Sequence, residues 1–270
     1  SVIATQVQQR LGPGPKADPF DVLQAMTDSG LASPDPGQTA AVEIAYSNRL
    51  SLITGGPGTG KSSVLKAIAS LARANRAGCR IKLVALAARV ARAIGARTDI
   101  EADTIHAALG LQPGQAATYG PHNPLPVDLI FIEEAFMIGN SLFAELLKAI
   151  PTQCQVVIVG DPEQLPPVME GKPAEALMTS GVIPNHRSEA RDIPIAGRRV
   201  MSGIELSPSE NVEIIREESV EAALATIKTR FEASILAGET AQILTAMHDG
   251  PLGTTSINKL ISGREKIDIG

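Results

Sequence analysis

A glycine-rich run in the first quarter of the chain constrains the fold more than any other feature. The run GGPGTGKS covers residues 55–62 and fits the pattern G-x-x-x-x-G-K-[ST]. An apolar segment at 50–53 precedes it, and a segment with helical periodicity at 61–75 follows it. A buried strand that turns through such a run into a helix is the context in which this pattern binds phosphate. The sequence therefore predicts a P-loop within an α/β fold.

The residue types in this run suit a nucleoside triphosphate. Glycines allow backbone N–H groups to turn toward the phosphates, and the following helix adds the positive end of its dipole. We expect Lys61 to reach the β- and γ-phosphates and Ser62 to ligate Mg²⁺, so the predicted ligand is Mg-ATP. The residues assigned to nucleotide binding in this run are Gly56, Pro57, Gly58, Thr59, Gly60, Lys61, Ser62 and Ser63.

Two later apolar segments end in polar residues suited to hydrolysis. The first, DLIFIEE at 128–134, ends in Glu133 and Glu134. We expect Glu133 to hold Mg²⁺ and Glu134 to orient and deprotonate the attacking water. The second is followed by GDPEQLPPV, in which the amide of Gln164 is expected to sense the γ-phosphate. By mechanism alone, Gly-Asp-Pro is equally an ordinary turn.

Composition limits the class of protein. Twenty-four Lys and Arg against 29 Asp and Glu give a formal net charge of −5, which excludes a basic protein that coats nucleic acid but not a local binding groove. No apolar run approaches the roughly 18 residues that span a bilayer, so no membrane partner is expected. Two cysteines and four histidines lie scattered, so we expect reduced thiols, no zinc site and a cytoplasmic protein.

The alternation of short apolar strands with helices predicts a parallel sheet covered by helices on both faces. Residues 1–37 are rich in Pro and Gly and are interpreted as a linker or the remnant of a preceding domain, with a short helix at 20–27. Residues 38–180 are expected to form the main α/β domain, and a second, incomplete domain is expected from 181 to 270. In the second we expect strands at 212–215 and 242–244 and helices at 220–236 and 256–261.

The motifs, in their order and spacing, resemble those of RecD and Dda-type helicases of superfamily 1B over about residues 35–262. LITGGPGTGKS, DTIHAALG, DLIFIEEAFMIG and VIVGDPEQLPPV resemble motifs I, Ib, II and III. The run at 186–188 resembles motif IV, and ILTAMHDGPLGTTSIN resembles the start of the second motor domain. The resemblance implies a RecA-like motor domain 1A at 38–180, a small hairpin insertion near 112–126 and the beginning of a RecA-like domain 2A at 181–270.

The resemblance also implies roles for individual residues. Gln38 is implied to read adenine, and Arg187 to contact the γ-phosphate. Single-stranded DNA is implied as the partner of Arg89, Thr104 and His106, although packing within the helix is an equal alternative for the histidine. The hairpin region is equally interpreted as an exposed loop. The family implies movement from 5′ to 3′ and a place beside other subunits of a recombination, repair or conjugation complex.

Several residues depart from the family pattern. Glu133 stands where the family has Asp, Ala87 where it has Thr, and Phe136 where it has Ser. The later motifs of the second motor domain do not occur, so we expect a fragment or a longer parent chain. We interpret the chain as the core of an ATP-hydrolysing DNA helicase. The alternatives are a hydrolysis-impaired module that binds single strands within a larger protein such as a conjugative relaxase, and a P-loop switch or kinase that binds no nucleic acid.

Overall fold

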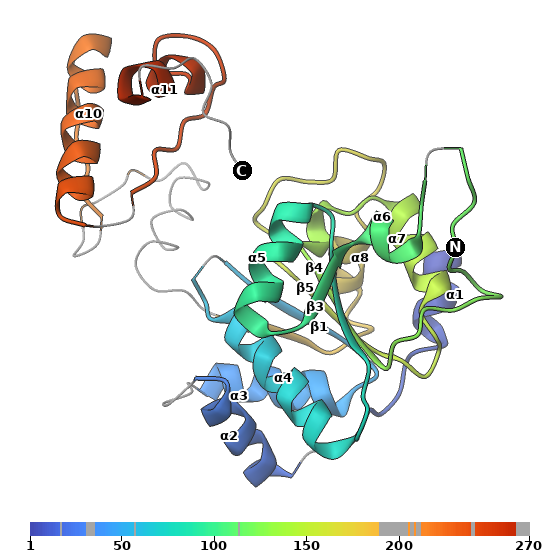
Figure 1. Ribbon diagram of the computed structural model, residues 1–270. Helices are drawn as coiled ribbons and strands as arrows, with labels where there is room; N and C mark the ends of the chain where they lie inside the picture. Colours follow the sequence, from blue (N-terminus) through green and yellow to red (C-terminus); the bar gives the residue numbers. More distant parts are fainter. Residues whose placement is uncertain are drawn as a thin grey trace. The chain divides into compact units, whose positions relative to one another are not determined.

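A six-stranded parallel sheet organises the first part of the chain in the computed structural model (Figure 1). The strands are β1 (Leu50–Gly55), β2 (Ile81–Ala85), β3 (Glu101–Thr104), β4 (Leu129–Glu133), β5 (Gln155–Gly160) and β6 (Asn185–Ser188). Their order is β3-β2-β4-β5-β1-β6, and each neighbouring pair is parallel. The carboxyl ends of all six strands therefore share one edge of the sheet, which is where open α/β folds bind ligands.

The structure describes residues 1–16, 18–30, 36–56, 58–112, 114–188, 205, 208, 212–238 and 241–262. The chain divides into two compact units, Ser1–Glu205 and Leu206–Gly270. Within the described residues, no helix has the length and apolar character needed to cross a membrane.

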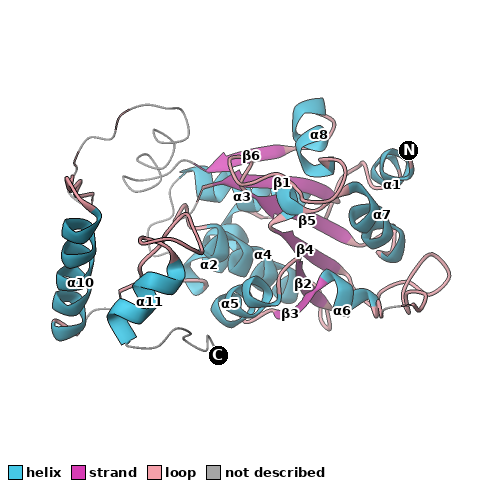
Figure 2. Ribbon diagram, turned by 90° about the horizontal axis from the view of Figure 1, so that it is seen from above, coloured by secondary structure: helices cyan, strands magenta, loops and turns pink. Residues whose placement is uncertain are grey.

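Helices cover both faces of the sheet in the first unit (Figure 2). One face packs against α2 (Pro19–Asp28), α3 (Pro36–Ser47), α4 (Lys61–Asn75) and α5 (Ala88–Thr98). The other face packs against α1 (Val2–Gln8), α6 (Ile105–Leu109), α7 (Asn140–Ala149) and α8 (Pro173–Ser180). The predicted α/β fold with a covered parallel sheet is confirmed.

The apolar strands fill two cores because successive side chains point to opposite faces. In β4, Ile130 and Ile132 join the core beneath α7, whereas Leu129 and Phe131 join the core beneath α4. Every residue of β4 is buried, as expected of a strand covered on both sides.

The N-terminal segment, interpreted from its prolines and glycines as a linker or domain remnant, contains two packed helices. α1 contacts α7, with Val7 in the core, and α2 contacts α3 and α4. Arg10 is fully buried, and its guanidinium donates to the carbonyl oxygens of Leu147 and Ile150 at the end of α7. Residues 1–37 thus belong to the first unit, because the Pro and Gly residues separate helices whose apolar faces find partners there.

The expected bounds of the helices match the structure closely where the helical pattern extends over many residues. Residues 61–75 and 220–236 are helical from end to end in α4 and α10 (Val220–Leu236). Gly95 lies inside α5, which continues to Thr98, so this glycine does not end the helix. Among the described residues, the α-helices and strands that the sequence did not predict are short and lack a periodic pattern: α1, β3, α8 and β6.

The boundary between the units differs from the expected one. β6 pairs with β1, so residues 185–188 belong to the sheet of the first unit, whereas a second domain was expected from 181. Within the described part of the second unit, two helices occur, α10 and α11 (Thr254–Ser262). The strands expected at 212–215 and 242–244 were wrong: apart from a single bridge at Val212, these residues have irregular backbone. A second RecA-like domain remains a prediction.

The region near 112–126 is a loop with one antiparallel bridge, between Gly120 and Asn123. Tyr119 packs against the core on the α7 face, whereas His122 is exposed. The described part of this segment contains a tight turn in place of an extended hairpin.

Candidate nucleotide-binding site

The P-loop connects β1 to α4 at the carboxyl edge of the sheet. Gly60 adopts a left-handed conformation with φ of 81° immediately before the helix, where a side chain is strained. A Cβ atom at this position would overlap the side-chain amide nitrogen of Gln38. The first turn of α4 therefore begins directly beside Gln38 of α3. Pro57 lies outside the described residues.

The position of Gln38 depends on how α3 is fixed. Gln155, buried at the start of β5, donates from its side-chain amide to the carbonyl oxygens of Ala45 and Tyr46, at 2.7 and 2.8 Å. These carbonyls lie in the last turn of α3, where helix acceptors lack partners within the helix. This contact ties the helix that carries Gln38 to the centre of the sheet.

Lys61 folds back onto the loop that precedes it. Its Nζ donates to the carbonyl oxygens of Gly55 and Gly56, at 2.5 and 2.9 Å. Thr59 Oγ1 also donates to Gly56, at 3.0 Å, so the loop is closed around its own backbone. Ser62 and Ser63 follow in the first turn of α4 and are partly exposed. The ammonium group of Lys61 is thus held at the mouth of the loop, where phosphate oxygens can replace the carbonyl acceptors.

The two acids lie where β4 ends. Glu133 is 2 % exposed, and burial, followed by the neighbouring charge of Glu134, raises the pKa of Glu133 to about 7. The nearby ammonium of Lys61 acts in the opposite direction. Oε2 of Glu133 accepts from the backbone N–H of Glu134 at 3.2 Å. The backbone N–H of Glu134 and the ammonium group of Lys61 favour the ionised form of Glu133, and a metal cation bound there would favour it further.

Glu134 has an unusual backbone. It adopts a left-handed conformation, with φ of 53° and ψ of 37°, which a residue with a side chain rarely takes. Its Oε2 atom is buried without a hydrogen-bond partner among the described residues. A left-handed residue at a strand end costs on the order of 1–3 kcal/mol and persists where the surrounding structure demands it. A buried oxygen with a free lone pair at the carboxyl edge fits a group that accepts a proton from water.

Gln164 lies on the loop that follows β5. Asp161, 6 % exposed, accepts from the backbone N–H of Glu163 at 2.9 Å, and Gln164 N–H donates to the Asp161 carbonyl at 3.2 Å. These bonds form the tight turn that Gly-Asp-Pro also predicted. Because Gly160 pairs with Thr54 of β1, the turn starts beside the P-loop, and the side chain of Gln164 is exposed there.

Arg187 lies on the other side of β1. β6 pairs with β1 in the register Thr54 to Arg187, so the backbone of Arg187 reaches the same edge as the P-loop. The side chain of Arg187 lies outside the described residues.

The residues expected to contact DNA lie at the far side of the same edge. Thr104 ends β3 and caps α6, accepting from the N–H of Ala107 at 3.1 Å, and His106 follows with an exposed side chain. Arg89 is exposed in the first turn of α5, which follows β2. Since β2 pairs with β3 in the register Ala85 to Thr104, these three residues come from neighbouring strand ends. The exposure of His106 favours surface contact over helix packing.

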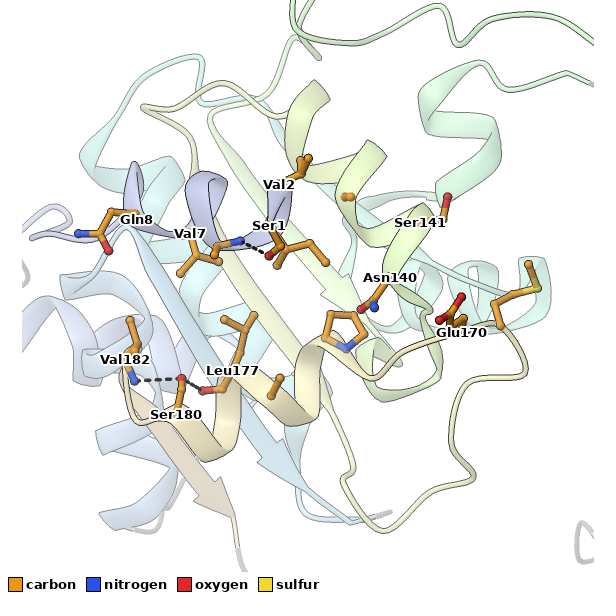
Figure 3. A pocket seen from close by; sticks show the side chains of 16 residues that line it. Ser1, Val2, Val7, Gln8, Asn140, Ser141, Glu170, Leu177, Ser180 and Val182 are labelled. Atoms are coloured by element: carbon orange, nitrogen blue, oxygen red, sulfur yellow. Dashed lines mark hydrogen bonds between the residues drawn. The ribbon is translucent and has the colours of Figure 1, made fainter.

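The predicted site residues therefore gather at one edge in two groups. The nucleotide group surrounds the ends of β1, β4 and β5, and the DNA group surrounds the ends of β2 and β3. A largely apolar groove of about 770 Å³ lies elsewhere, between α1, α7 and α8 (Figure 3), and none of the predicted site residues lines it. The predicted site residues thus lie at the strand ends, away from this groove.

Two residues of the site were not predicted as such. Phe136 was identified only as a departure from the family pattern, yet its ring packs on Gly160 at the end of β5. Asp161, whose side chain shapes the following turn, belongs to a predicted motif but had no predicted role of its own. Both residues adjoin Gly160, a small residue that ends a strand and precedes a polar turn. This sequence pattern does not reveal which side chain packs against the glycine.

Known proteins are similar to this chain along most of its length. Residues 38–170 match a protein-family model described as an AAA domain. The ATP-dependent RecD2 DNA helicase of Deinococcus radiodurans is 34% identical over 227 residues, covering 82% of this chain and 31% of that protein. The RecBCD enzyme subunit RecD of Mycolicibacterium smegmatis is 34% identical over 157 residues, covering 50% of this chain and 28% of that protein.

The solved structures that match include the Pif1 helicase from Candida albicans, with 17% identity and a TM-score of 0.47. That match covers 73% of this chain and 55% of the Pif1 chain. The present chain spans about a third of the two curated relatives just described.

Proposed function

We propose, on the premise that this chain belongs to the RecD-like helicases of superfamily 1B, that it binds Mg-ATP and hydrolyses it in response to single-stranded DNA. One observation carries the proposal. The P-loop after β1, the paired acids after β4 and the Gln164 turn after β5 meet at one edge of the sheet. These groups would supply three functions found in nucleotide hydrolysis: charge neutralisation, a base for the attacking water and a contact to the γ-phosphate.

Each group has a step in the proposed reaction. Lys61 exchanges the carbonyl oxygens of Gly55 and Gly56 for oxygens of the β- and γ-phosphates. Ser62 and Glu133 would hold Mg²⁺, which when bound would neutralise charge that develops on the phosphates. Glu134 orients water through its buried carboxylate and takes its proton. Gln164 and Arg187 contact the γ-phosphate from the two strands that flank β1.

The second group of residues gives the proposal its partner. Arg89, Thr104 and His106 come from the ends of β2 and β3, and two of them are exposed. A guanidinium, a hydroxyl and an imidazole suit the phosphates and bases of a single strand. Movement from 5′ to 3′ and work beside other subunits of a recombination, repair or conjugation complex stay predictions that follow from the family. A cytoplasmic location stays a prediction from the composition.

A module that binds single strands without efficient hydrolysis is the second candidate. Glu133 favours it, because its extra methylene relative to the family's Asp shifts the buried carboxylate that would hold Mg²⁺. Against it stand the intact Gly60-Lys61-Ser62 run and the free carboxylate oxygen of Glu134. A P-loop switch or kinase that binds no nucleic acid has no use for the residues at the ends of β2 and β3.

Steady-state ATP hydrolysis with and without oligo-dT tests the proposal, using the wild type and Lys61→Ala side by side. We expect turnover to rise strongly with oligo-dT and to vanish in Lys61→Ala, because the phosphates lose their counter-charge. DNA binding without stimulated turnover favours the non-hydrolysing module. Unchanged turnover in Lys61→Ala contradicts the site assignment itself.

A further inference from the structure

A single short turn contacts the elements at both ends of the loop that carries Gln164. The 3-10 turn η1 (Ala135–Met137) follows Glu134 directly. It contacts β5, where the loop at 161–172 begins, and α8, where that loop ends. The left-handed backbone of Glu134 starts this turn, so the orientation of the acid and the position of η1 are set together.

The contact at the start of the loop is made by an aromatic ring. A Cβ atom on Gly160 would lie 2.8 Å from Cδ2 of Phe136 and 3.2 Å from the backbone nitrogen of Ala135, closer than ordinary contact. Phe136 is only 7 % exposed. Glycine at the end of β5 therefore lets η1 approach until the ring lies against the backbone from which Asp161 and Gln164 emerge.

A second contact fixes the far end of the loop. The backbone N–H of Asn140, at the start of α7, donates to the carbonyl oxygen of Glu170 at 2.9 Å, and Figure 3 shows the two residues beside each other. Between these anchors the loop exposes apolar side chains, with Leu165 77 % and Val168 98 % exposed. The middle of the loop thus takes its position largely from its two ends.

We propose that Phe136 is a positioning residue that couples the carboxylate of Glu134 to the loop that carries Gln164. Its ring packs on Gly160, so a displacement of that loop moves η1, and with it the residue that immediately precedes η1. The coupling works by packing, since a phenyl ring offers no hydrogen bond to either group. This inference rests on the proposed function, because it concerns two groups assigned there to hydrolysis.

A double-mutant cycle tests the coupling. The variants are Phe136→Ala, Gln164→Ala and the double variant, measured for kcat and KM for ATP at saturating oligo-dT. We expect Phe136→Ala to lower kcat roughly 10- to 100-fold with little change in KM, as small displacements of catalytic groups do. The double variant should be no slower than Gln164→Ala alone, because both changes remove one shared effect. Phe136→Leu, which keeps apolar bulk, should restore most of the rate.

Other kinetic outcomes contradict the proposal. If the two losses multiply, Phe136 acts independently of Gln164. If either single variant keeps the wild-type kcat, the ring of Phe136 does not affect hydrolysis through the loop. Phe143→Leu is the matched control, because Phe143 is fully buried in the same core but lies on α7. It should lower stability while its effect on kcat, if any, multiplies with that of Gln164→Ala.

Hydrogen exchange of the amides at 161–172 provides a readout that needs no turnover. Phe136→Ala should speed exchange there, and Phe143→Leu should not. Unaltered exchange in Phe136→Ala overturns the proposal. If the wild type hydrolyses no ATP but exchange still rises in Phe136→Ala, the proposed function fails while the packing of the ring on the loop stands.

Discussion

At the scale of single residues, the two acids that end β4 have different surroundings, and this difference separates their roles. Glu133 is buried and interacts with the charge of Lys61, whereas Glu134 presents an oxygen without a partner among the described residues. A carboxylate near a lysine and a P-loop suits a metal, and one with a free lone pair suits water. The two side chains are therefore expected to respond differently to conservative substitution.

We predict that Glu134→Gln keeps ATP binding but lowers kcat on the order of 10²- to 10⁴-fold, the range for loss of a general base. The amide keeps the shape of the side chain and cannot take a proton. Stopped-flow binding of a fluorescent ATP analogue and steady-state turnover measure the two effects separately. Turnover at the wild-type rate would assign the base to another group.

We predict that Glu133→Asp raises turnover severalfold at saturating Mg²⁺. The shorter side chain restores the residue that the family has at this position, so the carboxylate would lie where the family's Asp holds the metal. Turnover measured as a function of Mg²⁺ concentration, with Glu145→Asp on the exposed side of α7 as a control, tests this. A lower rate in Glu133→Asp would mean that the rest of the site has adapted to glutamate.

At the scale of secondary-structure elements, buried polar groups join helices that the sequence leaves separate. The guanidinium of Arg10 donates to Leu147 and Ile150 at 2.9 and 2.5 Å and to Gln6 at 2.8 Å, and desolvation lowers the pKa of Arg10. The last carbonyl oxygens of a helix need donors from outside the helix. Arg10 supplies them at the end of α7 and so holds α1 against that helix. The residue therefore serves two helices at once.

Arg10→Met should lower the free energy of unfolding by about 2–4 kcal/mol, because two buried carbonyl oxygens lose their donor. Removing a buried charge regains part of the desolvation cost, yet the unsatisfied acceptors outweigh it. Urea denaturation of Arg10→Met and of Gln8→Met, an exposed position at the end of α1, measures the difference. Equal stability of the two variants would show that water replaces the guanidinium.

Asp128 joins the end of α4 to the start of β2 and β4. It forms ion pairs with Arg76 and Arg80, each at 2.9 Å, and its side chain is 10% exposed. The hydrogen bond from Arg80 is the main cause that lowers the pKa of Asp128 from 3.8 to about 2. Because the pKa is lower in the folded state, this stabilisation is complete above about pH 4 and is lost as the pH falls toward 2.

Asp128→Asn should therefore lower the free energy of unfolding by about 1–2 kcal/mol at pH 7. Solvent screening of the half-exposed arginines keeps this value small. The difference from the wild type should shrink as the pH falls below 4. Urea denaturation at pH 7, 4 and 3 provides the measurement. A difference that stays constant over this range would mean that Asp128 stabilises the protein by shape and not by charge.

At the scale of the whole molecule, the helices of the two units differ in how many of their residues are buried. α4 buries seven of its residues, whereas α10, although longer, buries none. Burial of apolar area is the main source of stability. The described part of the second unit is therefore expected to contribute little stability of its own.

We predict that amides of α10 exchange with deuterium much faster than those of α4 in the native chain. Exchange followed by mass spectrometry of peptides from 61–75 and 220–236 gives both rates in one experiment. Similar protection in the two helices would show that the second unit forms a stable core.

Features formed by neighbouring residues could be predicted from the sequence alone. A P-loop is a strand, a turn and a helix in direct succession, so neighbouring residues specify it, and Lys61–Asn75 forms the helix that the pattern predicted. The acids after β4 and the turn after β5 were predicted for the same reason. Only the tertiary structure decided which strand ends meet. It placed β6, and with it Arg187, beside β1, packed α1 and α2 against the sheet unit, and brought Phe136 onto Gly160. These contacts join residues far apart in the chain, and they depend on which surfaces pack together, which no local pattern of residue types contains.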